Sequence, residues 1–86
     1  MGRTNSEGEF PVVERWFIAV NHFIATEGMR GFKTFCDVYN LPRTTLARLE
    51  EEPHRHFRTE WLTLLVEKLG YSAHWLITGK GPMKQQ

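Results

Sequence analysis

The chain has 86 residues, of which 41% are hydrophobic and 24% are charged, and its formal net charge is +1 with neutral histidines. This length predicts one small domain that buries roughly 60% of its unfolded surface and leaves no room for a second domain. The nearly balanced charge excludes nucleic-acid binding that is driven by bulk charge alone, so such a function needs a local cluster of cations.

The expected location follows from features that the sequence lacks. The one cysteine, Cys36, cannot form a disulfide within the chain, which favours a reducing compartment. No apolar run approaches the roughly 20 residues of a membrane span, and the N-terminal residues show no signal-peptide pattern. We therefore expect a soluble, cytoplasmic protein without membrane contact.

A first helix is predicted from Pro11 to about Glu27, with Gly28 as its C-cap. Residues 1–10 before it are mostly polar, and we expect them to form a flexible arm. Two apolar stripes run along the helix; they consist of Val13, Phe17, Val20 and Ile24, and of Trp16, Ala19 and Phe23. A wide buried face explains both stripes, and a dimer surface formed by Trp16 and Phe23 is the alternative.

Two short helices across a tight turn are predicted next, over residues 31–39 and 42–51. Their apolar residues recur at helical spacing and are Phe35, Tyr39, Leu46 and Leu49, with Leu41 between the two pairs. Asn40 ends the first of these helices because asparagine enters the left-handed region at low cost. Pro42 suits the first turn of the next helix. That helix shows Arg43, Thr44, Ala47 and Arg48 outward.

The rest of the chain predicts two more helices. Thr59 is the expected N-cap of a fourth helix, which carries Trp61, Leu62, Leu65 and Leu69 and ends at Gly70. Ser72 is the expected N-cap of a fifth helix from Ala73 to about Thr78, closed by Gly79. Trp61 and Trp75 are expected in the core. The pattern as a whole predicts an all-α fold.

Two segments resemble the lambda-repressor-like helix-turn-helix regulators of phages and bacteria (Cro/C1, xenobiotic-response-element type). Residues 40–50, NLPRTTLARLE, are similar to the turn and recognition helix of that family, and residues 69–83, LGYSAHWLITGKGPM, are similar to its closing segment. The resemblance implies a compact five-helix DNA-binding domain over residues 11–83, with a helix-turn-helix formed by helices 2 and 3 and a tail at 84–86. Members usually carry Gln at the position of Phe32.

The resemblance places the third helix in the major groove of double-stranded DNA. Arginine bonds guanine bidentately and threonine contacts base edges or thymine methyl groups, so the expected base contacts are Arg43, Thr44 and Arg48. For Arg48 the alternative is a surface ion pair with Glu51 or Glu52. Thr45 is expected to contact phosphate, or else to be a semi-buried packing residue.

Four further cations flank this helix in the sequence. The expected phosphate contacts are Arg30 and Lys33 before the turn, and Arg55 and Arg58 after the third helix. Each of them taken alone is also typical of solvated surface. The carboxylates at residues 50–52 oppose both a nearby phosphate and the helix dipole, so we expect them to point away from DNA.

Enzyme chemistry finds little support in the sequence. His54 and His56 lack partners at metal-ligand spacing and are expected to be solvated loop residues. Cys36 is expected to be buried and inert. Gly79 and Gly81 belong to a turn, since the spacing of a phosphate-binding loop is missing. We expect no enzyme, no metal and no cofactor.

Two functions of different class are compatible with this domain. The first is a sequence-specific, repressor-like transcriptional regulator of phage or mobile-element type, which binds double-stranded DNA as a homodimer. The second is a protein-interaction module that keeps the fold with little DNA affinity, as Phe32 and the acidic residues 50–52 suggest. A dimer surface is expected on the fifth helix, with His74 and Ile77, or on the first helix. No small-molecule substrate and no ligand sensor are expected.

Overall fold

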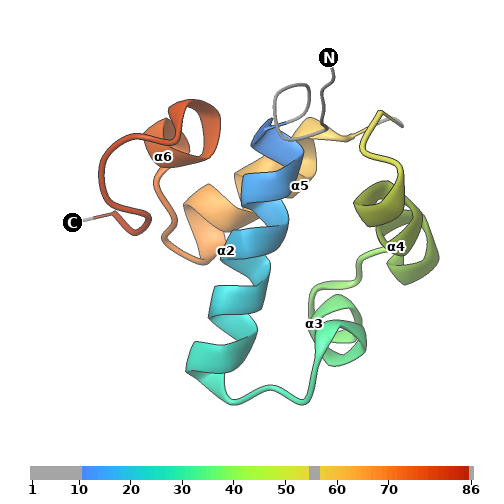
Figure 1. Ribbon diagram of the computed structural model, residues 1–86. Coiled ribbons are helices and arrows are strands. Elements are labelled where there is room, and N and C mark those ends of the chain that lie inside the picture. Colours follow the sequence, from blue (N-terminus) through green and yellow to red (C-terminus); the bar gives the residue numbers. More distant parts are fainter. Residues whose placement is uncertain (1–10, 55–56, 86) are drawn as a thin grey trace.

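A computed structural model describes residues 11–54 and 57–85 (Figure 1). Its helical elements are α2 (Pro11–Glu27), α3 (Phe32–Tyr39), α4 (Arg43–Glu51), α5 (Thr59–Thr63), the π-helix η1 (Leu64–Lys68) that continues α5, and α6 (Ala73–Thr78). The described residues contain no strand, only one isolated antiparallel bridge between Tyr71 and Lys84. For the part of the chain that the structure describes, the predicted all-α class with five helices is confirmed, counting α5 and η1 as one.

Helix α2 is the centre of the molecule. It runs through the middle of the ribbon, with α3 and α4 to one side and α6 to the other (Figure 1), and it contacts α3, α4, η1 and α6. Trp16, Ala19 and Val20 are completely buried. The indole nitrogen of Trp16 donates to the carbonyl oxygen of Trp61 at 3.0 Å, which ties α2 to α5. The wide buried face is therefore confirmed, and a dimer surface that exposes Trp16 is wrong.

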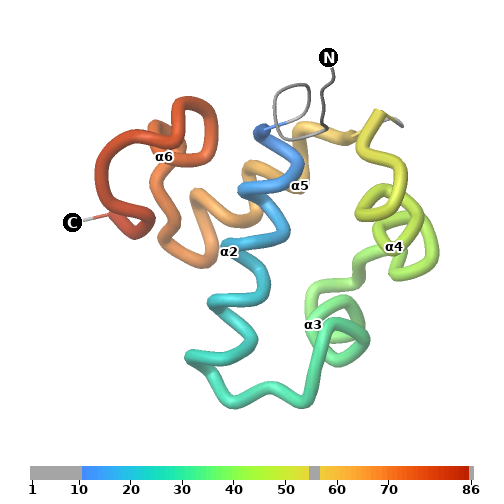
Figure 2. The backbone as a smooth tube through the Cα atoms, viewed as in Figure 1, coloured from blue at the N-terminus to red at the C-terminus, as the bar shows by residue number. Residues whose placement is uncertain are grey.

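Helices α3 and α4 meet at a turn that follows the predicted pattern. Asn40 takes the left-handed conformation with φ 57° and ψ 50°, and its backbone N–H donates to the carbonyl of Cys36. The N–H of Leu41 donates to the same carbonyl at 2.8 Å. Pro42 lies outside α4 as its N-cap residue, in an extended conformation, so α4 begins one residue later than expected. The path of the chain through this turn is easiest to follow in Figure 2.

The fourth helix differs from the prediction in two ways. Thr59 is the first residue of α5 and not its N-cap, which is Arg58 and provides no side-chain hydrogen bond. The Thr59 carbonyl instead accepts a hydrogen bond from the Thr63 hydroxyl at 3.3 Å. The second half of this helix is a π-helix, in which the N–H of Leu69 reaches back to the carbonyl of Leu64. The spacing of the apolar residues in the sequence did not indicate a π-helix, in which hydrogen bonds span five residues instead of four.

The C-terminal residues pack against the end of η1. The side-chain amide of Gln85 donates to the Val66 and Tyr71 carbonyls, each at 2.9 Å. The ammonium group of Lys84 donates to the Leu69 carbonyl at 3.1 Å and lies 4.5 Å from the centre of the Tyr71 ring. The carbonyls of Val66 and Leu69 lie at the end of the helix, where they would otherwise lack partners within it.

Helix α6 closes the fold as expected. Its N-cap is Ser72, whose hydroxyl accepts from the Trp75 N–H at 3.2 Å, and its C-cap is Gly79, with φ 78°. Trp61 is buried as predicted, whereas Trp75 is only partly buried against the core. None of the described helices is long and apolar enough to cross a membrane.

Candidate nucleic-acid interface

Helix α4 has one buried edge and one exposed face. Leu46 and Leu49 are buried to 1% exposure or less and hold the helix against the core. The polar residues that the sequence pointed outward are all exposed; they are Arg43, Thr44, Thr45 and Arg48. The interpretation of Thr45 as a packing residue is therefore wrong. All four residues belong to α4, which lies at one edge of the molecule (Figure 1).

The local reason for this exposure lies in the turn and in the spacing of the leucines. Leu46 and Leu49 stand three positions apart and share one face of the helix, so Thr44, Ala47 and Arg48 face away from the core. Arg43 and Thr44 form the first turn, where the exposed N–H groups and the helix dipole favour a negatively charged ligand. Among the described residues Arg48 forms no ion pair, so the alternative of a surface pairing with Glu51 or Glu52 is not observed.

The expected phosphate contacts differ from one another in whether they already form an ion pair. Arg30 is exposed in the connection between α2 and α3. Lys33 is exposed but lies 3.1 Å from a carboxylate oxygen of Asp37, one turn further along α3. Arg58 lies 3.3 Å from a carboxylate oxygen of Glu60. Arg55 lies outside the described residues. Because exposed ion pairs contribute only about 0–1 kcal/mol, a phosphate can displace either carboxylate.

Phe32 is the first residue of α3, and its ring packs against the core. Its ring is partly buried, 6.0 Å from the ring of Phe17 and stacked on Phe35 at 6.4 Å with an angle of 22°. Phe35 in turn contacts the rings of Phe23 and Tyr39. The aromatic side chain thus joins α3 to α2 and is unable to bind phosphate. The i, i+3 spacing of Phe32 and Phe35 was the sequence signal for this packing.

Cys36 follows Phe35 on α3 and is itself buried in the core. Burial raises its pKa, the neighbouring Asp37 raises it further, and Arg43 opposes the shift. A neutral, buried thiol is a poor nucleophile, so the expectation of an inert cysteine agrees with its surroundings.

The histidines and carboxylates of the described residues form no group of three or more that is arranged to hold a metal ion. His54 is exposed, and His56 lies outside the described part of the chain. At the end of α4, Glu50 and Glu51 are exposed and Glu52 is partly buried.

Known proteins offer no independent assignment for this arrangement. No protein-family model matches the chain, and no curated protein and no solved structure matches it either.

Proposed function

We propose that this chain is a sequence-specific double-stranded DNA-binding protein, in which α3 and α4 act as a helix-turn-helix of the lambda-repressor-like type. In this proposal it is a repressor-like transcriptional regulator of phage or mobile-element type that works in the cytoplasm. The observation that carries the proposal is the division of α4 between a buried edge, Leu46 and Leu49, and an exposed face with Arg43, Thr44 and Arg48.

The chemistry of that face suits the major groove. A helix is about 10–12 Å wide with its side chains, and the groove is about 12 Å wide, so α4 can enter it. Arg43 and Arg48 would bond the acceptor atoms of guanine, and Thr44 would contact a base edge or a thymine methyl group. Thr45, Arg30, Lys33 and Arg58 would fix the register through phosphates, as would Arg55.

A homodimer is part of the proposal, because one short helix reads few bases. Two copies would recognise an inverted repeat with half-sites about 34–36 Å apart, one turn of the double helix. Helix α6 is the better candidate for the dimer surface, since His74 is exposed and Ile77 is 59% exposed. Ile77 is one of the large apolar side chains that the described part of the fold leaves in solvent.

A second function is favoured by one observation. Phe32 packs on Phe17 and Phe35, so the position that would carry a phosphate-binding side chain serves the core instead. Glu50 and Glu51 add exposed negative charge at the end of α4. A protein-interaction module with the same fold would tolerate both features.

The decisive experiment is a fluorescence-anisotropy titration of the protein with a randomised duplex pool at two salt concentrations. The test variant is Arg43→Ala/Arg48→Ala. The matched control is Lys68→Ala/Lys80→Ala, which removes the same charge from two exposed sites outside α4.

If the protein reads DNA, wild type and control should bind, weaken with salt and enrich one sequence. The test variant should lose about 1–3 kcal/mol of discrimination for each arginine. Equal affinity of all three proteins for all duplexes, or no binding at low salt, would exclude α4 as a reader of sequence and favour the interaction module.

A further inference from the structure

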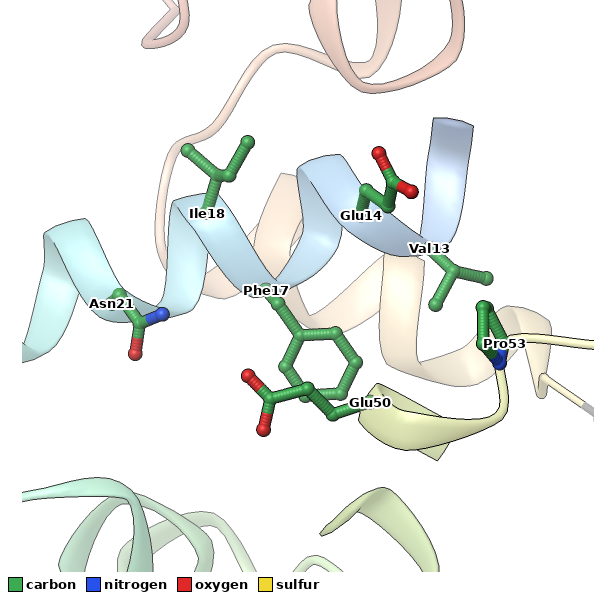
Figure 3. A pocket seen from close by; sticks show the side chains of 7 residues that line it. All are labelled: Val13, Glu14, Phe17, Ile18, Asn21, Glu50 and Pro53. Atoms are coloured by element: carbon green, nitrogen blue, oxygen red, sulfur yellow. The ribbon is translucent and has the colours of Figure 1, made fainter. Parts of the chain in front are cut away.

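A cleft lies between the first half of α2 and the end of α4 (Figure 3). Its volume is about 260 Å³. The described residues that line it are Val13, Glu14, Phe17, Ile18, Asn21, Glu50 and Pro53. In Figure 3 the ring of Phe17 points from α2 towards α4, and Pro53 faces Val13 across the opening.

The lining combines an apolar surface with negative charge. Val13 and Phe17 are each 7% exposed and form the wall on the side of the core, while Ile18 is 51% exposed. Glu14 lies on α2 and Glu50 on α4, and the described lining contains no lysine or arginine. The exposed carboxylate of Glu50 would attract a cation, and a cation with an apolar body would also find an apolar wall to pack against.

The size of the cleft limits the ligand. Pockets for drug-sized molecules typically measure about 300–1,000 Å³, so this cleft lies just below that range. It is large enough for one aromatic ring system with a short side chain. A helix of a partner protein is too wide, since it measures about 10–12 Å across.

We propose that this cleft binds a small organic cation, in which an aromatic body packs on Val13, Phe17 and Ile18 and an ammonium group lies against Glu50. The site goes beyond the DNA-binding proposal and does not depend on it. It was not expected from the sequence, because its walls come from residues 13–21 and 50–53, which only the packing of α2 against α4 brings together.

The test is a titration of the ¹⁵N-labelled protein, followed by two-dimensional amide NMR, with tryptamine as the probe. Indole-3-propionate has the same ring with a carboxylate, and it is the matched probe of opposite charge. Tryptamine should shift the amides of the cleft residues and saturate in the millimolar range, as expected for a ligand of this size. Indole-3-propionate should shift them far less.

Two variants separate the role of Glu50 from general electrostatics. Glu50→Gln should weaken tryptamine binding about two- to fivefold, the effect of one ion pair at a partly exposed site. Glu67→Gln removes an exposed carboxylate from η1 and should leave the affinity unchanged. The amide spectra of both variants also report whether each is folded.

Three results would overturn the proposal. They are equal binding of the two indoles, equal effects of the two variants, and the absence of shifts at the cleft amides with millimolar tryptamine. The DNA titration is a separate measurement, so failure of either proposal leaves the other open to its own test.

Discussion

The guanidinium group of Arg15 donates a hydrogen bond to the main-chain carbonyl of Leu76, 2.9 Å away and 61 positions later in the chain. It also donates to the carbonyl of Ile77 at 3.1 Å. Both carbonyls belong to the last turn of α6, where a positive charge also complements the helix dipole. Arg15 therefore joins the central helix to the end of the last one.

Gly79 is confined by this contact, and Gly79→Ala should destabilise the protein. Its φ of 78° costs an alanine about 1–2 kcal/mol. The new Cβ would also lie 2.8 Å from one nitrogen of Arg15 and 2.9 Å from another, so the guanidinium would have to move. Loss of its hydrogen bonds should add about 1 kcal/mol. Urea unfolding measures the total.

Gly28→Ala is the matched control for this prediction. Gly28 has a similar φ of 71°, and nothing lies within 4 Å of a Cβ built there. It should show the conformational cost alone. Equal losses of stability in the two variants would mean that the contact between Arg15 and α6 contributes nothing measurable.

The left-handed conformation of Asn40, in the turn between α3 and α4, leads to a prediction about substitutions at this position. Asn40→Gly should change the free energy of unfolding by less than about 1 kcal/mol, because glycine accepts a φ of 57°. Asn40→Val should cost about 1–2 kcal/mol or more, because a β-branched side chain is strained in this region. Thermal unfolding of both variants tests this. A stable Asn40→Val protein would show that the turn adopts another conformation.

The ion pair between Lys33 and Asp37 leads to a prediction about DNA affinity, which depends on the proposed function. Asp37→Asn removes a carboxylate that competes with phosphate for Lys33, so duplex binding should strengthen a few-fold at low salt. The gain should shrink as salt screens the charge. Stability should change by less than about 1 kcal/mol, because both side chains are about two-thirds exposed. Weaker binding by the variant would exclude this competition.

The buried ring of Tyr71 predicts a loss of stability in alkaline solution. Burial raises its pKa, and Glu27 raises it further. The folded state therefore keeps the phenol proton at pH values where the unfolded chain releases it. This contribution to stability is complete below the unfolded pKa of about 10 and is lost as the pH rises through the folded value.

Tyr71→Phe tests that contribution. Urea unfolding of the wild type between pH 8 and pH 11 should show a steeper fall in stability than the variant does above about pH 10, by at most about 1.4 kcal/mol per pH unit. At neutral pH the variant should be less stable, because it loses the 2.7 Å hydrogen bond between the phenol oxygen and Nδ1 of His22. Identical slopes would mean that this phenol ionises equally easily in both states.

Features that depend on neighbours within one turn were predictable from the sequence. The spacing of Leu46 and Leu49, the left-handed Asn40 and the Ser72 cap all follow from side chains and backbone groups a few residues apart. The exposure of Thr44 and Arg48 follows in turn from the buried leucines, which lie on the opposite side of the helix. The helical class and the outward face of α4 were therefore set locally.

Other features required the packed molecule. Phe32 joins the core because α2 presents Phe17 opposite α3, and the sequence did not show which helix would lie there. Arg15 reaches α6, and Gln85 reaches η1, across gaps in sequence that only the fold closes. The cleft beside Glu50 likewise has walls from two helices. Contacts between distant residues depend on how helices pack, and helix periodicity specifies a buried face without naming its partner.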